Sequence, residues 1–164
     1  MIAAVIGCAP CWKEDFDRLQ SLTSEFDVFA VGLDCPYIGR VDYFATYHPK
    51  DIEAYIKKRI RENLNTDFCV ISHVPEKGVQ VVYAYEKPSG SSSFLAAYAA
   101  VDLEYSKVVL IGCPLEGQNE KKYKYEVFQK GWIAHSPELK GRVRSMSGWT
   151  AVFLGEPDEE WIKR

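Results

Sequence analysis

The chain has 164 residues, of which 47% are hydrophobic and 26% are charged, and its formal net charge is −3. This length fits a single domain with a core of its own, and this composition excludes an intrinsically disordered chain. This slightly negative net charge does not attract the phosphate backbone of nucleic acids, so we expect no nucleic-acid partner.

The first half of the chain alternates short apolar runs with amphipathic segments. The apolar runs are stopped by turn residues such as Gly7, which is typical of strands covered on both faces. Between them, apolar side chains recur three and four residues apart, from Trp12 to Leu22 and again after Pro49, as on helices. The sequence predicts strands over 2–6, 27–33, 42–48 and 67–72 and helices over 12–22 and 49–60.

The second half begins with a β-rich stretch and a serine-rich loop. The segment after the loop is rich in alanine, which suits a helix packed closely against a sheet. The last third is less regular. We expect strands over 79–85, 107–112, 142–146 and 151–154, helices over 94–103 and from 157, and a charged stretch over 121–129. The alternation predicts an α/β fold of three-layer, Rossmann-like design, with a mostly parallel sheet and helices on both faces, in one domain over residues 1–164.

Cysteine usage and hydrophobicity indicate the cellular setting. Five cysteines are scattered through predicted strands and loops, unlike the disulfide framework of a small secreted protein. The apolar stretch 1–6 is too short for a signal-peptide core, and no segment approaches the roughly 20 apolar residues that span a bilayer. We therefore expect a cytoplasmic protein with no membrane span.

Three features at predicted strand ends are candidates for ligand binding. The turn at residues 7–10 and the serine-rich segment 89–93 each precede a helix, where backbone N–H groups can hold an anion. Asp34 closes the second strand, from which a carboxylate can bind ribose hydroxyls. The alternatives are a plain tight connection, a flexible loop and a turn-forming aspartate, respectively. The candidate ligand-binding residues are Gly7, Cys8, Pro10, Asp34, Ser89, Gly90, Ser91, Ser92 and Ser93.

The order of these segments resembles a known family. The segments are the Gly7-Cys-Ala-Pro10 loop, the strand from 27, the segment 41–46, Ser89-Gly-Ser-Ser-Ser93 before an alanine-rich helix, and 106–113. In this order they resemble the bacterial CMP-sialic-acid-dependent sialyltransferases and related uncharacterised Rossmann-like glycosyltransferase or motility-accessory domains, over residues 1–117. The resemblance implies a nucleotide ligand such as CMP, or a nucleotide sugar, at Gly7, Pro10, Ser89, Gly90 and Ser91.

The chain departs from the pattern of this family in two places. Cys8 stands where those enzymes commonly carry asparagine, and Cys113-Pro114 stands where they carry an aspartate. Nucleotide binding tolerates these changes more easily than glycosyl transfer does. The transferases use a histidine as general base and tyrosines near the leaving phosphate. The resemblance makes His135, with Tyr123 and Tyr125, the candidates for those roles, and His48 a rival base; the alternatives are a surface histidine and a turn histidine.

Two further hypotheses concern different classes of function. Cys8-Ala-Pro-Cys11 lies at a helix start, which suits a thiol–disulfide oxidoreductase with Cys8 as nucleophile and Cys11 as resolving thiol. A non-catalytic interaction domain is the other alternative, with aromatic residues of the last third in the core or in a homo-oligomer contact. There is no second C-x-x-C or histidine pair, so we expect no metal site.

Overall fold

Seven strands form one sheet in the part of the chain that the computed structural model describes, residues 1–33, 35, 39–83, 91–117, 122–135 and 137–164. Every pair of neighbouring strands is parallel, and the strand order is β5-β4-β3-β2-β1-β6-β7. The strands are β1 (Ile2–Ile6), β2 (Asp27–Val31), β3 (Tyr43–Thr46), β4 (Cys69–Ser72), β5 (Val81–Val82), β6 (Lys107–Ile111) and β7 (Val143–Ser145).

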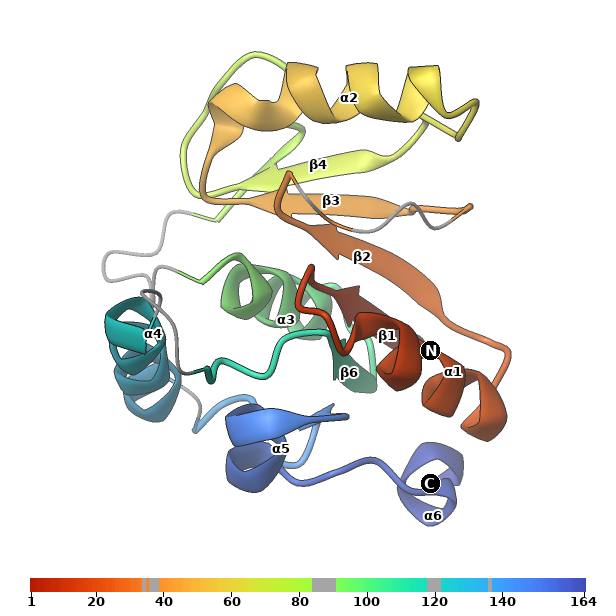
Figure 1. The fold of residues 1–164 in the computed structure, drawn as a ribbon, viewed down its shortest axis with the longest axis vertical. Helices are drawn as coiled ribbons and strands as arrows, with labels where there is room; N and C mark the ends of the chain where they lie inside the picture. Colours follow the sequence, from red (N-terminus) through yellow and green to blue (C-terminus); the bar gives the residue numbers. More distant parts are fainter. Residues whose placement is uncertain (34, 36–38, 84–90, 118–121, 136) are drawn as a thin grey trace.

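Helices cover both faces of the sheet, which confirms the predicted three-layer α/β architecture (Figure 1). One face packs against α1 (Trp12–Leu22), α2 (Ile52–Arg61), which follows the short 3-10 helix η1 (Pro49–Asp51), and α6 (Glu159–Lys163). The other face packs against α3 (Ser92–Asp102), α4 (Lys122–His135) and α5 (Gly148–Leu154). No helix in the described ranges combines the length and apolarity needed to cross a membrane.

Two separate cores follow from the alternation of side chains along each strand. In β1, Ala3 and Val5 belong to the core under α3, whereas Ala4 and Ile6 belong to the core under α1 and α2. Since both faces are covered, the central strands carry apolar side chains at almost every position. The same burial explains the alanines of α3, which are fully buried where this helix crosses β3, β2, β1 and β6.

The order of the strands creates a switch point between β1 and β6. From β1 to β5 the chain adds strands towards one side of the sheet. Helix α3 then returns across the sheet, so that β6 pairs with the other side of β1. The connections after β1 and β6 therefore lead away in opposite directions. In open α/β sheets, ligands bind outside the carboxyl ends of the strands at such a point.

The structure corrects two predictions. The predicted strand 151–154 is wrong: these residues end α5, a helix that begins at Gly148. The helix turns the chain back over the outermost strand, so that the Ser145 backbone N–H donates to the Gly155 carbonyl oxygen at 3.0 Å. A short apolar run has no periodicity that separates strand from helix. Of the predicted strand 79–85, the described residues 79–83 form a strand only at β5, Val81–Val82.

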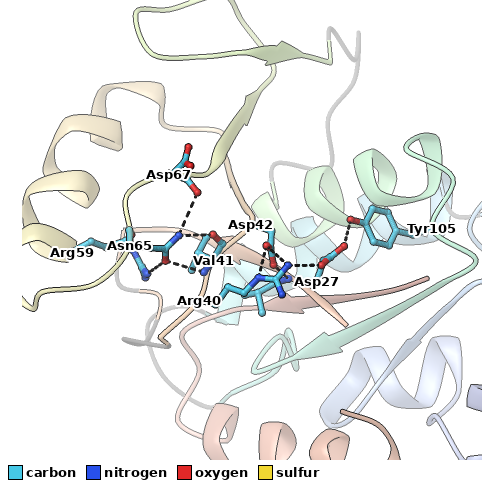
Figure 2. Close-up of polar contacts among 9 residues, drawn as sticks. Asp27, Arg40, Val41, Asp42, Arg59, Asn65, Asp67 and Tyr105 are labelled. Atoms are coloured by element: carbon cyan, nitrogen blue, oxygen red, sulfur yellow. Dashed lines mark hydrogen bonds and ion pairs between the residues drawn. The ribbon is translucent and has the colours of Figure 1, made fainter. Parts of the chain in front are cut away.

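The amino ends of β2 and β3 are joined by a polar network. Figure 2 shows Arg40 between Asp27 and Asp42, at 2.9 Å and 2.7 Å. Asp27 also accepts from the Tyr105 hydroxyl at 2.6 Å, and Asp42 accepts from the Val28 backbone N–H at 2.8 Å. These bonds satisfy both carboxylates within the fold. This edge of the sheet is therefore held together by its own side chains.

A buried arginine extends this network. Arg59 is 1% exposed and donates to the backbone and side-chain oxygens of Asn65, both at 2.6 Å, and to the Gly39 carbonyl at 3.0 Å (Figure 2). Asn65 in turn accepts from the Val41 backbone N–H at 3.1 Å. Helix α2 is thus tied to the segments before β3 and β4.

Candidate functional site

The connection after β1 is packed against the end of β6. The Gly7 N–H donates to the Ile111 carbonyl at 2.8 Å, and the Ala9 N–H donates to the Gly112 carbonyl at 3.2 Å. A Cβ atom on Gly7 would lie 2.6 Å from the Gly112 oxygen and from the Cys113 sulfur, closer than real Cβ contacts come. Gly7 therefore permits close packing of the 7–10 turn against the end of β6. Two backbone N–H groups of this predicted anion-binding turn are already hydrogen-bonded within the fold.

A buried carboxylate lies beneath this connection. Asp15 is 2% exposed, and its Oδ2 accepts from the Gly112 N–H at 2.9 Å and from the Ser147 hydroxyl at 2.7 Å. It thereby joins α1, the end of β6 and the start of α5. In the sequence, Asp15 is one of several charged residues between the apolar positions of α1, and it was not predicted as a site residue. Its spacing was the available signal, because Asp15 lies three residues after Trp12 and four before Leu19, on the apolar stripe of α1.

The C-x-x-C cysteines have different environments. Cys8 is exposed, whereas Cys11 is half-buried with its sulfur 3.4 Å from the Ser147 hydroxyl. Burial raises the pKa of the Cys11 thiol, and the charge of Asp15 raises it further, against a lowering by the contact with Ser147. Cys11 is therefore held as a thiol, whereas reactive cysteines have lowered pKa values.

The remaining cysteines and the acidic side chains give no cluster for a metal. Cys35 and Cys113 are buried, and their thiols donate to the carbonyls of Ile6 at 3.2 Å and Ile111 at 3.3 Å. Among the described residues, no three histidine, cysteine, aspartate or glutamate side chains are placed to hold a metal ion.

The serine-rich segment leads into α3 at the carboxyl end of β3. Ser91 precedes the first turn without a side-chain cap, and its hydroxyl lies 2.6 Å from that of Ser93. The Ser92 hydroxyl accepts from the Tyr47 backbone N–H at 3.3 Å, which fixes the start of α3 beside the residue that follows β3. The other predicted ligand-binding residues, Asp34, Ser89 and Gly90, lie outside the described residues.

Both predicted loops lie at the same edge of the sheet. The 7–10 connection follows β1, and α3 starts beside the end of β3, two strands away in the sheet order. Neighbouring strands are about 4.8 Å apart, so the two segments are separated by about 10 Å along this edge. That span suits a ligand of nucleotide size.

Two polar side chains lie next to the start of α3. Tyr47 follows β3 and His73 follows β4, with ring centroids 4.9 Å apart. The Tyr47 hydroxyl and His73 Nδ1 are buried, and neither has a hydrogen-bond partner among the described residues. Burial raises the pKa of Tyr47 to about 12, so this phenol stays protonated at neutral pH. Sequence patterns give this pair no role, because the pairing depends on which strands are neighbours.

The predicted catalytic residues lie on different elements. His135 ends α4, and its ring centroid lies 6.2 Å from that of Phe94 in the first turn of α3. Figure 1 shows α4 beside this end of α3. His48 is exposed and its backbone N–H donates to the Thr46 hydroxyl at 2.8 Å. Tyr125 packs against the core from α4, and the side chain of Tyr123 lies outside the described part.

A cavity of about 800 Å³ opens at the opposite edge, between the end of α1, the start of β1 and α6. Three cations in its lining are already paired: Arg40 with Asp27, Lys163 with Glu159, and Arg164 with Glu160. This cavity lies at the amino ends of β1, β2 and β6, whereas ligands of open α/β sheets bind outside the carboxyl ends of the strands. We therefore take the carboxyl edge as the candidate site.

Comparisons of the chain with protein-family models, with curated proteins and with solved structures found no match. The candidate site is therefore interpreted from its own geometry.

Proposed function

We propose that this protein binds a nucleotide, or a nucleotide sugar, across the carboxyl edge of its sheet. The observation that carries the proposal is the switch point between β1 and β6 in an all-parallel sheet. The 7–10 connection and the start of α3 both lie at that edge. A fold alone does not identify a ligand. We therefore use the polar groups at this edge to assign which part of the ligand binds where.

The phosphate is assigned to the start of α3. We expected phosphate contacts from both loops, but the Gly7 and Ala9 amides are bonded within the fold, and the carboxylate of Asp15 lies beneath them. A second negative charge near a buried carboxylate is unfavourable. The first backbone N–H groups of α3 lie at this edge, and helix N-termini favour anions. The nucleoside or sugar then extends towards the exposed Cys8 and Pro10.

A matched pair of variants tests this assignment. Thermal melting is followed with CMP, UDP, NAD and CMP- and UDP-sugars, and a bound ligand well above its Kd raises Tm by a few degrees. Ser92→Asp places a carboxylate at the start of α3, where it suits the helix dipole but repels phosphate. Ser92→Asn has the same size without the charge. We expect the shift to be lost in the first variant and kept in the second. No shift with any ligand would reject the proposal.

The thiol–disulfide alternative has less support. Its nucleophile, Cys8, is exposed, but the resolving thiol, Cys11, has a raised pKa beside Asp15 and Ser147. Thiol exchange is fastest when the attacking thiol has a pKa near the ambient pH. Glycosyl transfer, with His135 or His48 as base, remains an extension of the nucleotide proposal that the resemblance implies.

A further inference from the structure

The ends of β3 and β4 hold Tyr47 and His73 side by side. Thr46 and Ser72 are direct partners in the strand register, and the Ser72 hydroxyl donates to the Thr46 carbonyl at 2.8 Å. Tyr47 therefore follows β3 at the same level as His73 follows β4. The planes of their rings are inclined by 59°, and the ring centroids are 4.9 Å apart. The backbone, together with Ser72, fixes this pairing.

Each of the two side chains carries a polar atom without a partner. Buried polar atoms in folded proteins almost always form a hydrogen bond, because leaving one unpaired costs folding free energy. In the described part of the chain, the Tyr47 hydroxyl and His73 Nδ1 are buried and have none. Two such atoms on neighbouring side chains indicate a shared partner that the described part of the chain does not supply.

The surrounding groups indicate an anion as that partner. The Ser92 oxygen accepts from the Tyr47 backbone N–H, so the hydroxyl hydrogen of Ser92 remains available for donation. The first N–H groups of a helix have no acceptor within it, and α3 starts here. The Tyr47 hydroxyl adds another donor, since a phenol carries its proton at neutral pH. A tetrahedral phosphate presents several acceptor oxygens to such a set of donors.

We infer that Tyr47 and His73 bind the phosphate group of the ligand and determine specificity for phosphorylated nucleosides. This inference rests on the proposed nucleotide site and identifies the side chains that select its ligand. A nucleoside without phosphate lacks the oxygens that satisfy these two atoms. The protein therefore binds CMP in preference to cytidine.

The test compares stability with affinity. Tyr47→Phe removes an unpaired hydroxyl, so the Tm of the unliganded protein should stay the same or rise. The affinity for CMP should fall about tenfold, the usual effect of losing one hydrogen bond to a charged group, and the affinity for cytidine should not change. His73→Phe keeps an aromatic ring beside Tyr47 and should weaken CMP binding similarly.

Tyr105→Phe is the matched control. It removes a hydroxyl that is bonded to Asp27 at 2.6 Å, at the opposite edge of the sheet. We expect a lower Tm and unchanged affinity for CMP. If Tyr47→Phe lowers Tm as this control does, the Tyr47 hydroxyl has a partner within the fold and the inference is overturned.

Two further outcomes separate this inference from the proposed function. If Ser92→Asp abolishes CMP binding but Tyr47→Phe and His73→Phe bind normally, the nucleotide site stands and the role of the pair falls. Inorganic phosphate provides a probe that needs no nucleotide. We expect it to shift the amide NMR signals of Ser92 and Ser93 in the wild type and less in Tyr47→Phe. No shift in the wild type at tens of millimolar phosphate also overturns the inference.

Discussion

At the scale of single residues, buried polar groups of two kinds distinguish the carboxyl edge. The carboxylate of Asp15 accepts hydrogen bonds from Gly112 and Ser147, and it thereby links α1 to the end of β6 and the start of α5. The hydroxyl of Tyr47 and Nδ1 of His73 have no hydrogen-bond partner among the described residues and lie where the ligand is proposed. The first kind stabilises the fold, whereas the second is available for binding.

Asp15 should therefore be a stability residue. Asp15→Ala leaves the Gly112 N–H and the Ser147 hydroxyl without their acceptor, so the free energy of unfolding should fall by about 2–4 kcal/mol. Asp15→Asn keeps an acceptor oxygen in place and should cost less. Urea denaturation of the three proteins measures both effects. Equal stability of Asp15→Ala and wild type would show that the carboxylate does not join the three segments.

At the scale of elements, helix α3 leaves little room for larger side chains on its buried face. Ala96, Ala97, Ala99 and Ala100 are 0% exposed where the helix crosses the sheet. Their small side chains set the distance between the helix and the strands, and with it the position of the α3 start at the carboxyl edge of the sheet.

Enlarging one of these alanines should disturb both stability and binding. Ala97→Leu forces additional methyl groups into a filled core, which typically costs about 1–3 kcal/mol. Val101→Ile adds one methyl group at a half-buried position of the same helix and should cost much less. Chemical denaturation gives the stability, and the Tm shift with CMP gives the binding. Full stability of Ala97→Leu would mean that α3 does not pack as closely as described.

The elements also show what sequence patterns can predict. The strands from β1 to β4 and β6 were predictable, because burial on both faces leaves continuous apolar runs such as residues 107–111. The segment 151–154 was not, because a short apolar run is compatible with either element and tertiary contacts of α5 decide it.

For the site, the sequence predicted Ser91–Ser93 at a helix start. The pairing of Tyr47 with His73 could not be predicted, since it depends on which strands are neighbours.

At the scale of the whole molecule, buried acidic groups of raised pKa are distributed through both cores. Burial raises the pKa of the Cys35 thiol from 9.0 to about 12 and that of Tyr47 from 10.0 to about 12. Burial and the bond to Asp27 raise the pKa of Tyr105 as well. In each case the folded state keeps a proton that the unfolded chain releases.

The protein should therefore lose stability at alkaline pH. The contribution of these groups is complete below about pH 9 and is lost as the pH rises towards 12, because the unfolded state ionises first. The urea midpoint at pH 10.5 should lie clearly below that at pH 8. Cys35→Ala should show a smaller decrease. A midpoint that does not change between these pH values would contradict the prediction.

Because every described strand pair is parallel, the two edges of the sheet are chemically different. The Asp27–Arg40–Asp42 network fastens one edge, while the residues proposed to touch the ligand lie at the other. New ligand preferences can therefore be engineered, or acquired in evolution, by changing a few side chains after β1, β3 and β4. The scaffold that supports them would remain intact through such changes.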